Sequence, residues 1–151
     1  MRFLLACLLT AITVPVVASD LRIDNAYARA SIPGQNTSAA FATLHNDSRQ
    51  ELRLQSLQSD AAGRVELHRH EQLDGMMRMR KVDNFSLPAG ASVDLKAQGM
   101  HLMLLDLAAP LVAGQTIRIE LCFGQQCSSH DFAVTGIADE PQTPAHSHHH
   151  H

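Results

Sequence analysis

The chain alternates apolar and polar residues in short runs that turn-forming residues interrupt. Alternation with a period of two is typical of β-strands that bury one face. Turn signals such as Pro33-Gly34 and Asp74-Gly75 separate the runs, and no stretch shows the apolar period of about 3.6 residues that marks a long helix. The pattern predicts an all-β fold, an antiparallel sandwich or barrel. Strands are expected at residues 21–29, 39–45, 52–57, 64–70, 77–82, 92–95, 101–107, 116–122 and 131–134.

The first 19 residues have the composition of a secretory signal peptide. Arg2 supplies a positive charge, residues 3–14 form an apolar run, and small residues precede Asp20. The run is shorter than the roughly 20 residues that span a bilayer. We therefore expect a cleaved signal (1–19), export to the periplasm, and no stable membrane anchor afterwards. The segment ending at Cys7 resembles a lipoprotein processing site, but almost no hydrophobic region precedes it, so Cys7 is assigned to the discarded signal.

The rest of the chain divides into one domain, expected at 20–137, and a polar tail, expected at 138–151. A chain of the domain's length can bury a single stable core. The tail offers too few apolar residues to order itself, so we expect it to be disordered. Terminal histidines can be a purification tag, but the signal is still present, which favours a native tail that binds copper(II) weakly. Its candidate ligands are His146, His148, His149, His150 and His151.

Composition argues against several classes of function. The formal net charge is −3, whereas nucleic-acid-binding proteins show a basic stripe. There is no tryptophan and one tyrosine, so aromatic platforms for bases or sugars are poorly supplied. No nucleophile, base and orienting residue form a recognisable motif, and we therefore do not expect an enzyme.

Two cysteines, Cys122 and Cys127, lie outside the expected signal and flank a short Phe-Gly-Gln-Gln turn. In an exported protein such a pair is first a disulfide candidate. Facing residues of a hairpin approach each other closely enough for that bond. A reduced thiolate pair that binds a metal is the alternative.

Methionine and histidine gather in one part of the chain. A single methionine usually fills a gap in a core, but five of them share one window with three histidines. Thioether sulfur is a soft, neutral donor that suits copper(I) and needs no deprotonation. Zinc would favour cysteine, histidine and carboxylate, and the window has no cysteine. Its members are His68, His70, Met76, Met77, Met79, Met100, His101 and Met103.

Strand alternation sorts these donors by face. His68 and His70 are expected on one face of their strand, and Met77 and Met79 likewise share a face. His101 and Met103 share a face as well, while Met100 takes the other. Since a short polar link ending in Asp74-Gly75 predicts a hairpin, imidazole and thioether donors can collect in one pocket.

The spacing His68-x10-Met79-x21-His101-x-Met103 resembles the signature of the PCu(A)C-type periplasmic copper chaperones. Flanking residues 65–68, 74–79 and 87–90 agree, and the resemblance covers nearly the whole mature domain. It implies a cupredoxin-like, Greek-key β-sandwich in which these four residues bind copper(I). It also implies delivery to the dicopper CuA centre of cytochrome c oxidase, with the subunit carrying that centre or another copper chaperone as partner.

His70 departs from the family pattern, which often has methionine there. It can add a fifth donor, or tolerate copper(II) on arrival, or be an ordinary histidine at the rim; Met77 is a further candidate donor. A copper buffer or tolerance protein would use the same ligands. A blue-copper electron-transfer protein is disfavoured because no methionine follows Cys127 and His130, and the methionine-rich window would have no role.

Overall fold

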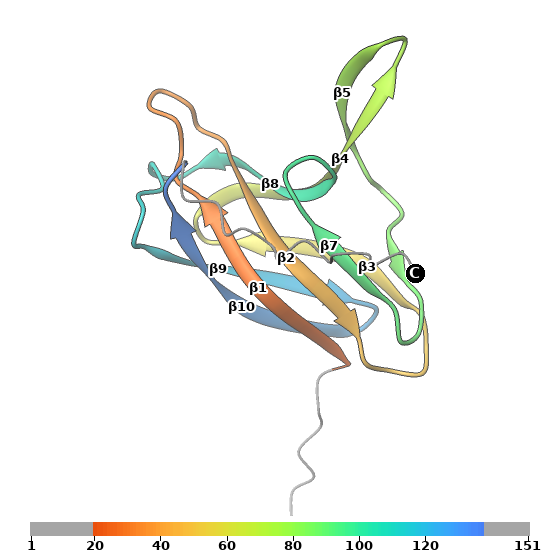
Figure 1. The fold of residues 1–151 in the computed structure, drawn as a ribbon. Helices are drawn as coiled ribbons and strands as arrows, with labels where there is room; N and C mark the ends of the chain where they lie inside the picture. The colour runs from red at the N-terminus through yellow and green to blue at the C-terminus, as the bar shows by residue number, and fades with distance from the viewer. Residues whose placement is uncertain (1–19, 138–151) are drawn as a thin grey trace, which may run out of the picture.

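The computed structural model describes residues 20–137, which form an all-β domain (Figure 1). The expected signal peptide (1–19) and histidine-rich tail (138–151) lie outside the described residues. The described part contains no helix long and apolar enough to cross a membrane. The strands are β1 (Leu21–Arg29), β2 (Ser38–Asn46), β3 (Leu52–Ser59), β4 (Ala62–Leu73), β5 (Met76–Lys81), β6 (Ser86–Leu87), β7 (Ser92–Leu95), β8 (Met100–Leu107), β9 (Thr116–Phe123) and β10 (Gln126–Thr135).

The strands form one hydrogen-bonded path that folds into a sandwich. Its order is β5-β4-β8-β2-β1-β10-β9-β3-β6, and β7 pairs with β2. β1 joins the two layers because it pairs with β2 on one side and β10 on the other. The all-β sandwich predicted from the sequence is confirmed, with one exception to its antiparallel character: β1 and β10 run parallel. Alternation cannot reveal this exception, since a half-buried strand has the same pattern in either direction.

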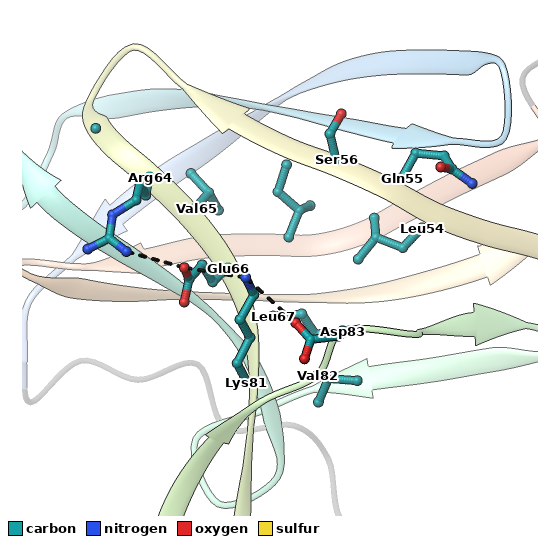
Figure 2. A pocket seen from close by; sticks show the side chains of 12 residues that line it. Leu54, Gln55, Ser56, Arg64, Val65, Glu66, Leu67, Lys81, Val82 and Asp83 are labelled. Atoms are coloured by element: carbon teal, nitrogen blue, oxygen red, sulfur yellow. Dashed lines mark hydrogen bonds and ion pairs between the residues drawn. The ribbon is translucent and has the colours of Figure 1, made fainter.

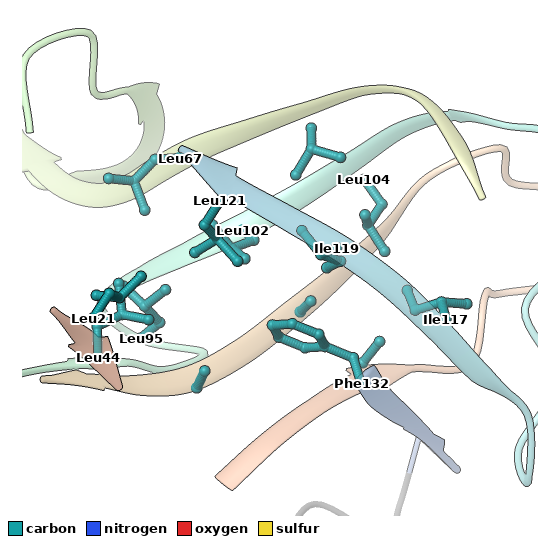
Figure 3. Packing of buried hydrophobic residues seen from close by; sticks show 14 of the residues in the cluster. Leu21, Leu44, Leu67, Leu95, Leu102, Leu104, Ile117, Ile119, Leu121 and Phe132 are labelled. Carbon is teal, nitrogen blue, oxygen red and sulfur yellow. The ribbon is translucent and has the colours of Figure 1, made fainter. Parts of the chain in front are cut away.

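The core fills the space between the layers (Figure 3). Leu102 and Leu104 of β8 are at most 1% exposed and lie in one cluster with Ile119 of β9. Burying each such side chain contributes roughly 1.5–3 kcal/mol. Because alternate residues of a strand point to opposite faces, this burial turns His101 and Met103 to the outer face of the sheet.

The β4–β5 hairpin extends beyond the sandwich (Figure 1). Asp74 and Gly75 have φ of 51° and 77°, the two left-handed residues that a tight hairpin turn of the mirror-image type requires. Every residue of β5 is exposed. The predicted hairpin is therefore present, while β6 was not predicted because two residues are too few to show alternation.

Asn46, the last residue of β2, stabilises the loops around that end of the strand. It is 1% exposed, and its amide nitrogen lies 2.7 to 3.0 Å from the carbonyl oxygens of Gln50, Leu87 and Pro88. Its side-chain oxygen accepts a hydrogen bond from the backbone N–H of Ser48. One buried side chain thus ties together the end of β2, the loop at Ser48–Gln50 and the segment at Leu87–Pro88.

We expect Asn46→Ala to lower the free energy of unfolding by roughly 2–4 kcal/mol, because buried carbonyls lose their donors and a cavity opens. Chemical denaturation measures the change. Asn84→Ala, at an exposed loop position, is the matched control. Equal and small effects from the two substitutions would contradict the structural role of Asn46.

Candidate metal centre

The register of β4 against β8 brings the two predicted imidazole ligands face to face. His68 is directly opposite His101, and their ring centroids are 6.4 Å apart. Glu66 is directly opposite Met103 in the same pairing. Since facing residues of neighbouring strands share a side of the sheet, all four side chains lie on the outer face.

β5 adds its donors along the other edge of β4. Met79 is directly opposite His70, and Met77 is opposite Gln72, nearer the tip of the hairpin. Met79 is 46% exposed and Met77 is 61% exposed. The structure thus brings Met79 to the same face as His68 and His70, with Met77 farther out.

The remaining methionines of the window lie on the opposite face. Met76 is opposite Leu73, and Met100 is opposite Arg69. Met100 is partly buried against the hydrophobic core. Neither position shares the face that carries the histidines, so both have ordinary packing or surface roles.

A carboxylate orients His68. The His68 Nε2 atom lies 2.8 Å from Oε2 of Glu66, and because an ionised carboxylate only accepts, Nε2 carries the proton. The pKa of Glu66 is lowered, first by this hydrogen bond and then by the charges of Lys81, His68 and Arg64. Figure 2 shows Glu66 between Arg64 and Lys81. The other ring nitrogen, Nδ1, is buried without a hydrogen-bond partner within residues 20–137, as a nitrogen reserved for a metal would be.

The surroundings of His101 favour its neutral form and orient its ring. It is 2% exposed, and burial lowers its pKa. The hydrogen bond with Gly99 opposes this shift, while the nearby charges of His70, His68 and Arg29 act in the same direction as burial. Its Nδ1 lies 3.2 Å from the carbonyl oxygen of Gly99, which can only accept. The proton is therefore on Nδ1, and the Nε2 lone pair is left for a metal. The ring of Phe41, 6.3 Å from that of His101, contributes to its burial.

The cysteines form a separate structural feature. Cys122 and Cys127 face each other across β9 and β10 and are joined by a disulfide. Although Glu120 has a ligand atom within 4.8 Å of both sulfurs, bonded sulfurs are not thiolates and do not form a metal site. His45 is likewise engaged elsewhere, with Ser92 and Asp24.

A cavity of about 360 Å3 opens beside Glu66, between β3 and β4. Its lining includes Leu54, Val65, Val82 and Asp83 (Figure 2). No histidine or methionine lines it, so the candidate metal donors lie on the sheet face rather than in this cavity.

Three residues that support the centre were not predicted from the sequence: Glu66, Gly99 and Phe41. Glu66 could have been found, because it precedes His68 by two residues and therefore shares its face. Phe41 and Gly99 give no such signal, since their contacts with His101 depend on how β2 and the loop before β8 pack.

Residues 21–134 match the model of the family described as "Putative lipoprotein LpqE-like". The chain belongs to the LpqE-like family. The Leifsonia xyli subsp. xyli protein Lxx21020 is 31% identical over 113 residues, which are 74% of this chain and 67% of that protein.

Solved structures extend the likeness of this LpqE-like protein. The copper-bound PCuAC domain from PmoF2 has a TM-score of 0.66 at 20% identity and covers 80% of this chain and 97% of that domain. The Cu(I) form of DR1885 from Deinococcus radiodurans is 29% identical, with a TM-score of 0.58 over 76% of this chain and 75% of that protein. The predicted PCu(A)C-type family and cupredoxin-like fold are confirmed.

We expect Glu66→Gln to weaken copper(I) binding by about tenfold, because loss of a partner that orients a ligand typically costs 10- to 100-fold in metal affinity. An anaerobic competition titration measures the affinity. Glu71→Gln, on the same strand but the other face, is the control. An unchanged affinity in Glu66→Gln would show that the carboxylate does not support His68.

We expect Met103→Leu to weaken copper(I) binding at least tenfold and Met100→Leu to leave it nearly unchanged, since only the first removes a sulfur from the outer face. Both substitutions keep the bulk of the side chain, so the unfolding midpoint should change little. The same competition titration compares them. Equal effects on affinity would contradict the assignment of donors by strand face.

Proposed function

We propose that this protein is a copper(I)-binding chaperone that holds one ion with His68, Met79, His101 and Met103. The observation that carries the proposal is the pairing of His68 with His101, each with one nitrogen already hydrogen-bonded and the other available. A thioether on β5 and another on β8 lie on the same face. Two imidazoles and two thioethers form a donor set that suits copper(I).

The family supports copper as the cargo. A PCuAC domain of the same fold has been solved with copper bound, and DR1885, at 29% identity, has been solved with Cu(I). The lipoprotein description of the family supports an exported protein. We infer a periplasmic protein with a cleaved signal peptide, as the composition of residues 1–19 predicts.

Exposure of the hairpin supports delivery rather than permanent storage. Met79 is 46% exposed on an edge strand, so the donor of a partner can approach the ion as this thioether leaves. The inferred acceptor is the CuA centre of cytochrome c oxidase, reached through the subunit that carries it or through another copper chaperone. The protein thus binds and transfers an ion and is not an enzyme.

Two other functions rank lower. A periplasmic copper buffer or tolerance protein would bind copper(I) with the same residues but would not load an acceptor. Blue-copper electron transfer needs a cysteine thiolate, and the cysteines at residues 122 and 127 are bonded to each other. The histidine-rich tail is inferred to capture copper(II) weakly in either of the copper-binding roles.

The test is an anaerobic copper(I) competition titration of the protein and of a His101→Ala/Met103→Leu double variant. We expect one tightly bound copper(I) in the protein and at least a hundredfold weaker binding in the variant, because two of four ligands are lost. His45→Ala/Met76→Leu is the matched control, since it removes the same residue types away from the centre.

Similar copper(I) binding by both double variants would overturn the proposed site. A second experiment separates chaperone from buffer, by mixing the copper(I)-loaded protein with a copper-free CuA domain. After addition of a one-electron oxidant such as ferricyanide, the visible spectrum of an assembled mixed-valence CuA centre supports delivery, and retention of all copper by the protein favours the buffer.

A further inference from the structure

His70 lies closer to His101 than His68 does. The ring centroids of His70 and His101 are 5.2 Å apart, against 6.4 Å for His68 and His101. His70 is two residues from His68 on β4, so both point to the outer face. Three imidazoles therefore converge on one side of the β4–β8 pair.

These distances suit ligands of a common ion. With metal–nitrogen bonds of about 2 Å, two imidazoles on one metal have ring centres roughly 4.5 Å apart when the bonds meet at a right angle and roughly 6.3 Å apart when they are collinear. The 5.2 Å separation of His70 and His101 corresponds to an angle of about 110° between the bonds, and the 6.4 Å separation of His68 and His101 lies at the collinear limit.

One carbonyl group ties His70 to His101. The carbonyl oxygen of Gly99 lies 3.2 Å from Nδ1 of His101 and accepts a hydrogen bond from the backbone N–H of His70 at 3.3 Å. The backbone of one histidine and the ring of the other are thus positioned by the same group. This shared anchor fixes the backbone of His70 relative to the ring of His101, and the face of β4 on which His70 lies brings its ring to 5.2 Å from that of His101.

We propose that the same face binds copper(II) through His68, His70 and His101, in a donor set that does not use the methionines. Copper(II) prefers nitrogen and oxygen donors in tetragonal geometry, whereas thioethers favour copper(I). Water completes the copper(II) set. His68 and His101 serve both oxidation states, and His70 is specific to copper(II).

His70 and Met79 are direct neighbours across β4 and β5. The two donor sets therefore differ at adjacent positions on the same edge, where half-buried His70 meets exposed Met79. Copper(II) would be bound by His70 and copper(I) by Met79, so a change of oxidation state exchanges one of these side chains for the other. The hydrophobic core stays unchanged. This inference deepens the proposed function and rests on it.

The test uses the full chain with its tail histidines replaced, because they would also bind copper(II). His70→Gln and Met79→Leu are compared in that background by copper(II) competition titration, electron paramagnetic resonance and anaerobic copper(I) titration. The background changes are His146→Ser, His148→Ser, His149→Ser, His150→Ser and His151→Ser.

We expect His70→Gln to weaken copper(II) at least tenfold, to remove one nitrogen coupling from the resonance spectrum, and to change copper(I) affinity by less than about threefold. Met79→Leu should have the opposite effect: it should lower the affinity for copper(I) and leave the affinity for copper(II) nearly unchanged. His70→Met introduces a thioether, which copper(II) disfavours, so it should weaken copper(II) binding as His70→Gln does. An unchanged unfolding midpoint in each variant excludes misfolding as the cause.

Unchanged copper(II) binding in His70→Gln would overturn the three-histidine set, and so would an equal loss of both oxidation states. Neither result contradicts the proposed copper(I) chaperone if Met79→Leu still lowers the affinity for copper(I). An unchanged copper(I) affinity in Met79→Leu would instead contradict the proposed function itself. The two proposals therefore fail by different readouts.

Discussion

The antiparallel pairing of β4 with β8 is the constraint on which the candidate centre depends. It sets His68 directly opposite His101, and it sets Leu67 directly opposite Leu102 in the core. A slip of one residue would turn the leucines to the outside and the histidines to the inside. The burial that stabilises the sandwich therefore also fixes the face and the register of the metal donors, and no separate interaction is needed to bring the imidazoles together.

Neighbouring groups then decide which atom of each ring is available. Glu66 occupies Nε2 of His68, and the Gly99 carbonyl occupies Nδ1 of His101. The two rings thus offer different nitrogens, a choice that the spacing of the histidines alone does not dictate. Burial of His101, to which Phe41 contributes, adds a further effect, because it lowers the pKa of the ring and so favours the neutral form that keeps a lone pair. The fold itself therefore orients both rings.

Much of the fold could be predicted from the sequence because it depends on local alternation. The predicted strand at 21–29 agrees with β1, and the left-handed turn at Asp74 and Gly75 follows from the residues themselves. The parallel pairing of β1 with β10 could not be predicted, since direction leaves no mark on alternation. The faces of the site residues follow from the same period, whereas the approach of His70 to His101 depends on cross-strand register, which only the folded chain defines.

The imidazole and thioether donors differ in how buried they are and in how firmly their strands are held. His101 is 2% exposed and held on a strand that is paired on both sides, while Met79 is 46% exposed on the edge strand β5. Differences in affinity between related complexes arise mostly from the rate of dissociation. If every donor were buried, the donor of a partner could not reach the ion, and the ion would be released slowly. A centre with rigid imidazoles and an accessible thioether can keep the ion in place while one donor is exchanged. The edge position of β5 thus connects the topology of the sheet with the proposed ability to pass copper on.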